Sequence, residues 1–348
     1  MIVNTEPFHK ALTLLKRTTG SEMENPFLVM HSSKGRLHLA SRESHISTLI
    51  KVPVMGEIKP VSTLLNPIYY FTKNIKSKAI EITGSKNLTL TSLGTQENLV
   101  VPAVDITPEI RPVYHAGTKI IRTSSLLHAL DRVSLPLQEE EDVIAITANS
   151  LSGYSQNIIT SATIPISDTN GLLPYAPARR LIKLLKLCPE SLQYTTGMEN
   201  HIRFTARNNP LEIEITVSPD ALIPSELPAI PTPQPSFYVE TQFLYHRLRR
   251  LSLITKGIPT KTLLHFDGLN LHVTTSNSHL TSSFSISTKS LSFNPAFIPC
   301  RLRPLLSFVS AVRTTRKIYF CISEKTWLLK NNLALMAIIS CGVKNKIQ

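Results

Sequence analysis

The sequence predicts an α+β protein made of three copies of one domain, each with two helices and a set of antiparallel strands. Three observations predict it: an amphipathic helical segment that recurs at a constant interval, a second helical segment in each third of the chain, and strand–turn–strand segments with alternating apolar and polar residues. The chain has 348 residues, of which 42% are hydrophobic and 18% charged. This length suits two or three domains, and the apolar content suffices for their cores.

The first helical segment of each third carries the same apolar stripe. It occupies residues 8–17, 126–134 and 244–252. Phe8, Leu126 and Leu244 begin the three stripes, and each lies 118 residues after the one before it. Apolar residues follow at i+4 and i+7 in every copy, which places them on one side of a helix. Agreement at three positions in three copies indicates an internal repeat.

The second helical segment of each third opens at a proline. Pro67 follows Asn66, a good N-cap residue, and begins PIYYFTKNIK, while Pro177 and Pro299 begin PARRLIKLLKL and PCRLRPLLSFV. Proline favours the first helical position because that position needs no backbone N–H. Pro304 lies inside the third segment, so that helix is expected to start late or to bend.

Strand–turn–strand segments lie between and after the helices. They cover residues 28–52, 143–166 and 263–287, with turns at Ser33–Gly35, Asn149-Ser150 and Asp267-Gly268. Period-two alternation with such turns is typical of β-hairpins. His38 and His272 occupy corresponding positions, as do His45 and His279. We interpret these histidines as outward-facing strand residues rather than metal ligands.

Two proline-rich connectors separate the thirds of the chain. Residues 101–119 contain three prolines, and residues 218–237 contain six. Because proline removes backbone donors and stiffens the chain, these segments are expected to be extended connections between domains. The predicted domains are 1–115, 116–235 and 236–348.

The sequence offers no support for an enzyme, a metal site or a cofactor. It contains no GxxxxGK[ST], GxGxxG, GxSxG or HExxH motif. Its four cysteines (Cys188, Cys300, Cys321 and Cys341) are scattered and are interpreted as reduced thiols. The sequence has no apolar segment long enough to span a membrane and no basic region ahead of an apolar start, so we expect a cytoplasmic protein. The run 139–142 is the only acidic one, and we interpret it as a solvated loop.

Positive charge concentrates on the expected helices. The chain has 37 Lys and Arg against 24 Asp and Glu, a net charge of +13. The segments 8–17, 67–78, 122–133, 177–187, 243–251 and 299–312 hold 17 basic residues and one acidic residue, Asp131. Ordinary solvated helices mix the two signs. This distribution predicts a common basic surface that contacts the phosphates of a nucleic acid without reading its sequence. Tyr69 and Tyr70 are interpreted as packing residues.

The candidate DNA-binding residues all come from these segments. They are Lys10, Lys16, Arg17, Lys73, Lys76, Arg132, Arg179, Arg180, Lys183, Lys186, Arg247, Arg249, Arg250, Arg301 and Arg303.

The order of these features resembles the bacterial DNA polymerase III β subunit, the sliding clamp. The resemblance rests in the first third on FHKALTLLKR, GRLHLASRESHISTLIKV, LNPIYYFTKNI and VPAVDITP, and in the last third on FLYHRLRRLSLITKG, AFIPCRLRPLLSFV and RKIYFCIS. The middle third contributes LPYAPARRLIKLLK. The resemblance implies three clamp-like domains that close as a head-to-tail ring homodimer, with helices lining the hole. It implies a non-catalytic DNA replication processivity factor that encircles double-stranded DNA and tethers the polymerase.

The resemblance also implies an interface between the two subunits and a pocket for partner peptides. Leu253 and Ile254 would pack against strand 95–101 of the other subunit, which contains Leu99; the alternative is that they belong to the core of their own domain. The pocket would bind polymerase and clamp-loader peptides. Its residues would be Gln156, Asn157, Pro224, Ile338, Ile339, Ser340 and Cys341.

The sequence departs from the family in two respects. Clamps of this family are usually acidic, whereas this chain carries +13. The family's Thr-Asp-Gly-His-Arg-Leu stretch at the pocket is replaced by residues 154–159, Tyr-Ser-Gln-Asn-Ile-Ile, which lack the His-Arg pair. Two alternatives remain open: a clamp-derived DNA-binding module that does not close into a ring, and a basic nuclease, which would need a carboxylate cluster beside the basic surface.

Overall fold

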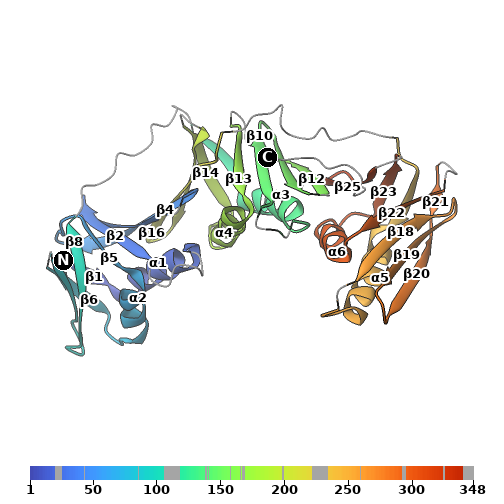
Figure 1. Cartoon of the computed structure of the whole chain (residues 1–348). Coiled ribbons are helices and arrows are strands. Elements are labelled where there is room, and N and C mark those ends of the chain that lie inside the picture. The colour runs from blue at the N-terminus through green and yellow to red at the C-terminus, as the bar shows by residue number, and fades with distance from the viewer. Residues whose placement is uncertain are drawn as a thin grey trace. The chain divides into compact units, whose positions relative to one another are not determined.

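The structure is a computed structural model (Figure 1). It describes residues 1–339 apart from 20–25, 43, 85, 106–117, 138, 140, 157, 165, 167–168, 198–199, 222–233, 259, 292–294 and 324–325. The fold is α+β, as the sequence predicts, and the chain forms two compact units. The first unit comprises Met1–Leu127 and Arg179–Asp220, and the second comprises His128–Ala178 and Ala221–Gln348.

The six expected helical segments are all helices. Their bounds are α1 Thr5–Thr18, α2 Leu65–Asn74, α3 Thr123–Ser134, α4 Tyr175–Leu185, α5 Thr241–Ile254 and α6 Leu302–Ala311. α6 starts late, as Pro304 predicts, because Ala296–Cys300 forms a strand and the proline then lies in the first helical turn. None of the helices in the described ranges is long and apolar enough to cross a membrane.

The first unit contains a twelve-stranded antiparallel sheet. Its strands, in spatial order, are β1 (Ile2–Asn4), β6 (Ala79–Thr83), β7 (Asn87–Ser92), β8 (Asn98–Asp105), β5 (Val61–Leu64), β2 (Phe27–Ser33), β3 (Arg36–Arg42), β4 (Ile46–Met55), β16 (Leu211–Val217), β15 (Ile202–Asn208), β14 (Ser191–Thr196) and β9 (Lys119–Arg122). β1 also pairs with β4, so the first eight strands close on themselves.

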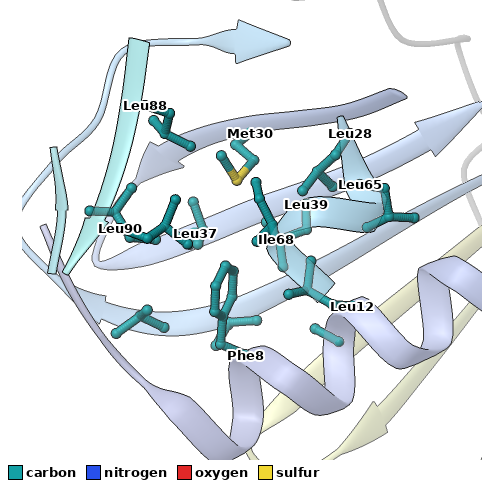
Figure 2. Close-up of a cluster of buried hydrophobic side chains, with 14 of the residues drawn as sticks. Phe8, Leu12, Leu28, Met30, Leu37, Leu39, Leu65, Ile68, Leu88 and Leu90 are labelled. Atoms are coloured by element: carbon teal, nitrogen blue, oxygen red, sulfur yellow. The ribbon is translucent and has the colours of Figure 1, made fainter. Parts of the chain in front are cut away.

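The core of the first unit lies between this closed set of strands and helices α1 and α2. Phe8, Leu12 and Leu15, the stripe that the repeat predicts on α1, are fully buried. Figure 2 shows Phe8 and Leu12 pointing from the helix toward the apolar side chains of the strands, Leu37 and Leu39 among them. Burial of apolar surface on this scale is the main stabilising contribution to the unit.

The second unit contains two antiparallel sheets. The nine-stranded sheet has the order β13 (Gly171–Pro174), β10 (Val143–Thr147), β11 (Ser150–Ser155), β12 (Ile158–Thr163), β25 (Ala334–Ile339), β24 (Thr326–Lys330), β23 (Lys317–Ile322), β17 (Phe237–Glu240) and β21 (Lys289–Ser290). The four-stranded sheet has the order β20 (Thr281–Ser287), β19 (Asn270–Ser276), β18 (Lys261–Phe266) and β22 (Ala296–Cys300). Helices α5 and α6 pack against each other.

The three expected strand–turn–strand segments are hairpins, β2–β3, β10–β11 and β18–β19. Each turn contains a residue with positive φ: Gly35, Asn149 and Gly268 at 71°, 63° and 101°. Glycine and asparagine tolerate this conformation best, which explains why they occur there. His38 and His272 lie on strands, where they face His31 and His265 with ring centroids 4.5 and 5.4 Å apart. Among the described residues, no group of three potential ligands could hold a metal ion.

The repeat is also visible in how the sheets continue from one third of the chain to the next. β4 follows the β2–β3 hairpin in the first third of the chain. It pairs with β16, the last strand of the middle third. In the same way, β12 of the middle third pairs with β25 of the last third. We call these pairings the two junctions. β20 and β8 are the corresponding strands that take part in neither junction. In the described part of the chain β20 pairs with β19 alone, whereas β8 pairs with β7 through residues 98–102 and with β5 through residues 103–105.

Candidate nucleic-acid interface

The helices carry most of the candidate DNA-binding residues, and they remain strongly basic with their observed bounds. The basic residues within helices are Lys10, Lys16, Arg17, Lys73, Arg132, Arg179, Arg180, Lys183, Arg247, Arg249, Arg250 and Arg303, against two acidic residues, Glu6 and Asp131. Glu6 was not expected in a helix, because α1 begins at Thr5, ahead of the apolar stripe.

Five basic residues that the sequence places on helices lie outside them: Lys76, Lys78, Arg122, Lys186 and Arg301. α2 ends at Asn74 because the backbone of the next residue is extended, with φ −78° and ψ 145°. Arg122 ends β9, and Arg301 directly precedes α6 with an extended backbone. All five side chains are nevertheless exposed, so they stay accessible to a ligand.

Helix α4 separates its charges from its apolar residues. Arg179, Arg180 and Lys183 are half-buried or exposed, whereas the apolar residues that pack the helix against the rest of the protein are buried. The buried set is Ala178, Leu181, Ile182, Leu184 and Leu185. Leu187 lies beyond the helix and is only half-buried. Charges that project one to two turns apart on one side of a helix can contact successive phosphates.

Arg132 on α3 is the least accessible of the candidate residues. It is half-buried, and its Nε atom is buried without a hydrogen-bond partner in the described part of the chain. Burial lowers the pKa of its guanidinium from the ordinary value. Arginine stays protonated even so, because its ordinary pKa is above 12.

Two candidate residues are paired with carboxylates of the chain itself. Lys10 Nζ lies 2.7 Å from Glu6 Oε1, one turn away on α1, and this bond lowers the pKa of the exposed Glu6. Arg301 donates a hydrogen bond to Glu139. The interpretation of residues 139–142 as a solvated loop is wrong for Asp142, which is buried and accepts a hydrogen bond from the backbone N–H of Glu139 at 2.9 Å.

The remaining basic residues of the second unit are available on α5 and α6. Arg249, Arg250 and Arg303 are exposed. Arg247 is half-buried, and its guanidinium carbon lies 5.1 Å from the ring centroid of Phe243, one turn earlier on α5. A cation over an aromatic face keeps its charge while its orientation is restricted.

In the first unit, Arg17 and Lys73 are exposed, and Lys16 is half-buried between α1 and α2. Lys16 Nζ donates a hydrogen bond of 2.9 Å to the Tyr70 hydroxyl. The interpretation of both tyrosines as packing residues holds for Tyr69, which lies partly buried against the core. It is wrong for Tyr70, which is 51% exposed.

Exposed apolar residues lie at the end of α5 and along β8. Leu253 and Ile254, the last two residues of α5, are 65% and 53% exposed, so they do not belong to the core of their own domain. Leu99 on β8 is half-buried against the core of the first unit. Val100 and Val104, which no pattern in the sequence sets apart, are 59% and 68% exposed.

The repeat explains why these β8 residues are exposed. Leu99 pairs with Leu90, Ile215 of β16 pairs with Phe204, and Met336 of β25 pairs with Leu329. We align the three hairpins at these apolar pairs, which makes Leu99 equivalent to Ile215 and Met336. Ile215 and Met336 are 1% and 0% exposed because each lies in a junction, opposite Thr48 and Thr160 respectively. Leu99 has no such neighbour in the described chain and remains half-buried.

The expected peptide pocket falls only partly within the described residues. Gln156 is exposed, in the turn between β11 and β12. Ile338 is 3% exposed and lies opposite Ile158 across the β12–β25 junction. Asn157, Pro224, Ser340 and Cys341, together with the side chain of Ile339, lie outside the described residues.

The fold matches solved structures of bacterial sliding clamps, although no protein-family model and no curated protein matches the sequence. The DNA polymerase III subunit beta from Pseudomonas aeruginosa superposes with a TM-score of 0.78 at 13% identity, over 97% of this chain and 98% of that one. The beta sliding clamp of C. crescentus gives 0.78 at 11% identity, over 97% of both chains. The Thermotoga maritima beta subunit gives 0.72 at 13%, over 97% and 98%. The expected clamp fold is therefore confirmed.

Proposed function

We propose that this chain is a divergent member of the bacterial DNA polymerase III β family and acts as a DNA sliding clamp. Two copies close head to tail into a ring that encircles duplex DNA, with basic helices toward the hole. The observation that carries the proposal is the pair of junctions within the chain. It leaves β20, and residues 98–102 of β8, with a neighbouring strand on one side alone in the described chain. In this proposal the domains are 1–115, 116–235 and 236–348, and the protein works on DNA in the cytoplasm.

A third junction between copies completes the pattern that the chain already contains twice. β20 is equivalent to β4 and β12, and β8 is equivalent to β16 and β25. Pairing β20 of one copy with β8 of a second therefore repeats the same strand arrangement. Because the two surfaces differ, the contact is heterologous, and two copies close the ring. Closure also covers an edge strand that would otherwise be free to pair with other chains.

The exposed apolar residues support the same contact. The β8 position of Val100 corresponds to Thr216 and Ala337, which are 8% and 0% exposed in the two junctions, against 59% for Val100. Leu253 and Ile254 offer apolar area at the end of α5 in the last third of the chain. In the proposed ring they pack against β8 of the other copy, beside Leu99.

The basic helices supply the contact with DNA. Arginine and lysine side chains on α1–α6 are suited to phosphates, and phosphate contacts carry no sequence information. The proposed mechanism is topological, since a closed ring cannot leave DNA without opening, while weak salt-screened contacts let it slide. In this role the protein has no active site. It holds replicative polymerase and clamp-loader peptides at the pocket that includes Gln156 and Pro224.

A ring closed covalently around DNA tests the proposal without a clamp loader. The register of the first junction places Leu99 opposite Ser282 of the second copy, and that of the second junction places it opposite Phe284. Paired residues in antiparallel strands have Cα atoms about 4.5–5.5 Å apart, within the range a disulfide needs. We expect Leu99→Cys with either Ser282→Cys or Phe284→Cys to form a cross-linked dimer, in a variant whose four native cysteines are replaced by alanine.

The readout is retention on DNA of different topology. The cross-linked dimer, oxidised in the presence of nicked circular DNA, should remain on the circle through a high-salt wash and leave when the circle is linearised. The Leu99→Cys variant alone is the matched control, because it cannot close the ring and should be washed off both substrates. Equal behaviour of the double variant on circular and linear DNA would exclude encirclement and favour the open DNA-binding module.

A further inference from the structure

The ammonium of Lys16 is held between two tyrosines where α1 and α2 pack against each other. Its Nζ atom lies 4.4 Å from the ring centroid of Tyr69 and 4.0 Å from that of Tyr70. It also donates a hydrogen bond of 2.9 Å to the Tyr70 hydroxyl. An ammonium has three N–H donors, so two remain for a ligand. A lysine side chain usually gives up considerable rotamer freedom on binding, and here part of that ordering has already occurred.

Further contacts hold Tyr69, one of the two tyrosines, in place. Tyr69 packs against the core of the first unit and stacks on His9, with ring centroids 5.3 Å apart. His9 Nδ1 lies 3.1 Å from Thr72 Oγ1, whose hydroxyl donates to the backbone carbonyl of Tyr69 at 2.9 Å. Because Thr72 has one proton to give, His9 Nδ1 is the donor in the first of these bonds. Burial, and then the charge of Lys73, lowers the pKa of His9, which favours the neutral ring.

The Tyr70 hydroxyl is a second donor beside the ammonium. It accepts the hydrogen bond from Lys16, which leaves its own O–H free to donate, and the residue is 51% exposed. The bond from Lys16 and the charges of Lys16 and Lys73 lower the pKa of Tyr70, so its O–H is more acidic than that of an ordinary tyrosine. A more acidic O–H donates a stronger hydrogen bond to an anionic oxygen.

We propose that Lys16 and Tyr70 form a preorganised subsite for one phosphate of the nucleic-acid backbone, with the Tyr70 O–H and a Lys16 N–H donating to its non-bridging oxygens. Lys73, one turn along α2, adds charge without direct contact. The subsite deepens the proposed function, on which it rests for its ligand. Stacking of an unpaired base on the Tyr70 ring is the competing use of an exposed aromatic residue beside basic groups. The position of the Lys16 ammonium over that ring favours the phosphate.

The experiment compares two conservative variants of the full-length chain for binding to a short DNA duplex by fluorescence anisotropy. Tyr70→Phe removes only the hydroxyl and should weaken binding about tenfold to hundredfold, the size of one hydrogen bond to a charged group. It should leave the salt dependence unchanged because no charge is lost. Lys16→Gln should weaken binding and lower the log–log salt slope by roughly 0.9. The double variant should lose less than the product of the single effects, because both residues hold one phosphate.

Tyr238 provides the matched control. It lies on β17 with Lys317 Nζ 4.1 Å from its ring centroid, a lysine–tyrosine pair on strands instead of helices. Tyr238→Phe should bind duplex like the unmodified chain. Unchanged binding by Tyr70→Phe would overturn the proposal, and so would a loss seen only with Tyr70→Ala and single-stranded DNA, which identifies base stacking. If the cross-linked ring stays on circular DNA while Tyr70→Phe has no effect, the subsite is wrong and the clamp function stands.

Discussion

Replacing Leu253 and Ile254 by alanine should dissociate the proposed ring while leaving each copy folded. Complete burial of such a side chain stabilises by about 1.5–3 kcal/mol, and these two are still 65% and 53% exposed in the single chain. Burying the remainder in an interface is therefore worth about 1–1.5 kcal/mol each, or about 2–3 kcal/mol per interface. A head-to-tail ring of two copies has two interfaces, so the dimer loses about 4–6 kcal/mol. The dissociation constant should rise by roughly a thousandfold to ten-thousandfold.

Sedimentation equilibrium over a range of concentrations measures this constant directly. Phe297→Ala is the matched control, since Phe297 is 73% exposed on β22, which forms the edge of the four-stranded sheet opposite to β20. It should leave the dissociation constant unchanged. The melting temperature of the Leu253 and Ile254 variant, measured where the unmodified chain is monomeric, should stay close to that of the unmodified chain, because the lost area lies outside the fold. A dimer of unaltered strength would refute the interface, and an unmodified chain that never dimerises would refute the ring.

Three further predictions concern the fold. Phe8→Ala should lower the free energy of unfolding by about 3–5 kcal/mol in chemical denaturation, since Phe8 is fully buried. Phe27→Ala, at a position 65% exposed, should lower it far less. Equal losses would contradict the core assignment. Gly153→Ala should lower the free energy of unfolding by about 1–3 kcal/mol, because the new Cβ would lie 2.6 Å from a side-chain oxygen of β12. An unchanged denaturation midpoint would show that the neighbouring side chains move aside without cost. Asp267→Asn should lower the melting temperature at neutral pH, because hydrogen bonds from His272 and two backbone N–H groups hold the pKa of Asp267 well below its ordinary value. That stabilisation is complete above about pH 4 and is lost as the pH falls toward the lowered pKa, so the difference in melting temperature should shrink in acid; a difference that persists unchanged would refute the carboxylate's role.

The helices and hairpins could be predicted because their signals are local. The stripe of Phe8, Leu12 and Leu15 follows from the period of one helix and is buried as expected. The turns at Gly35 and Gly268 follow from a conformation that few other residues tolerate. Repetition strengthened each signal, since a pattern that is ambiguous once becomes informative when it recurs at the same spacing.

The charge pairing could not be predicted because it depends on tertiary contacts. The partner of Arg301 is Glu139, 162 residues away in the sequence. The acidic run around Glu139 looks like a solvated loop in sequence, yet the fold buries Asp142 and turns it toward a backbone N–H. A residue's charge is visible in the sequence, whereas its neighbours are decided by how the sheets and helices pack.

The exposed strand residues show the same limit. In the sequence, Val100 resembles any apolar residue of a half-buried strand. Its neighbours in the sequence do not distinguish it from Ala337, the equivalent residue, which is buried. The difference in exposure becomes visible only in the structure, where Ala337 lies in a junction between two strands and Val100 does not. Tyr70 is similar, because exposure separates it from Tyr69 although both belong to one helical turn.

Chain connectivity also determines where the proposed ring can open. The junctions β4–β16 and β12–β25 join parts of one polypeptide, so strands that separate there remain at high effective concentration and pair again. The proposed β8–β20 junction would join two molecules and would have no such tether. Opening for the entry of DNA should therefore occur at this junction, and its strength should set the time a ring stays on DNA. The proposed phosphate contacts of Arg179 and Lys183 would affect sliding and salt dependence, and removing them should leave retention on a closed circle intact.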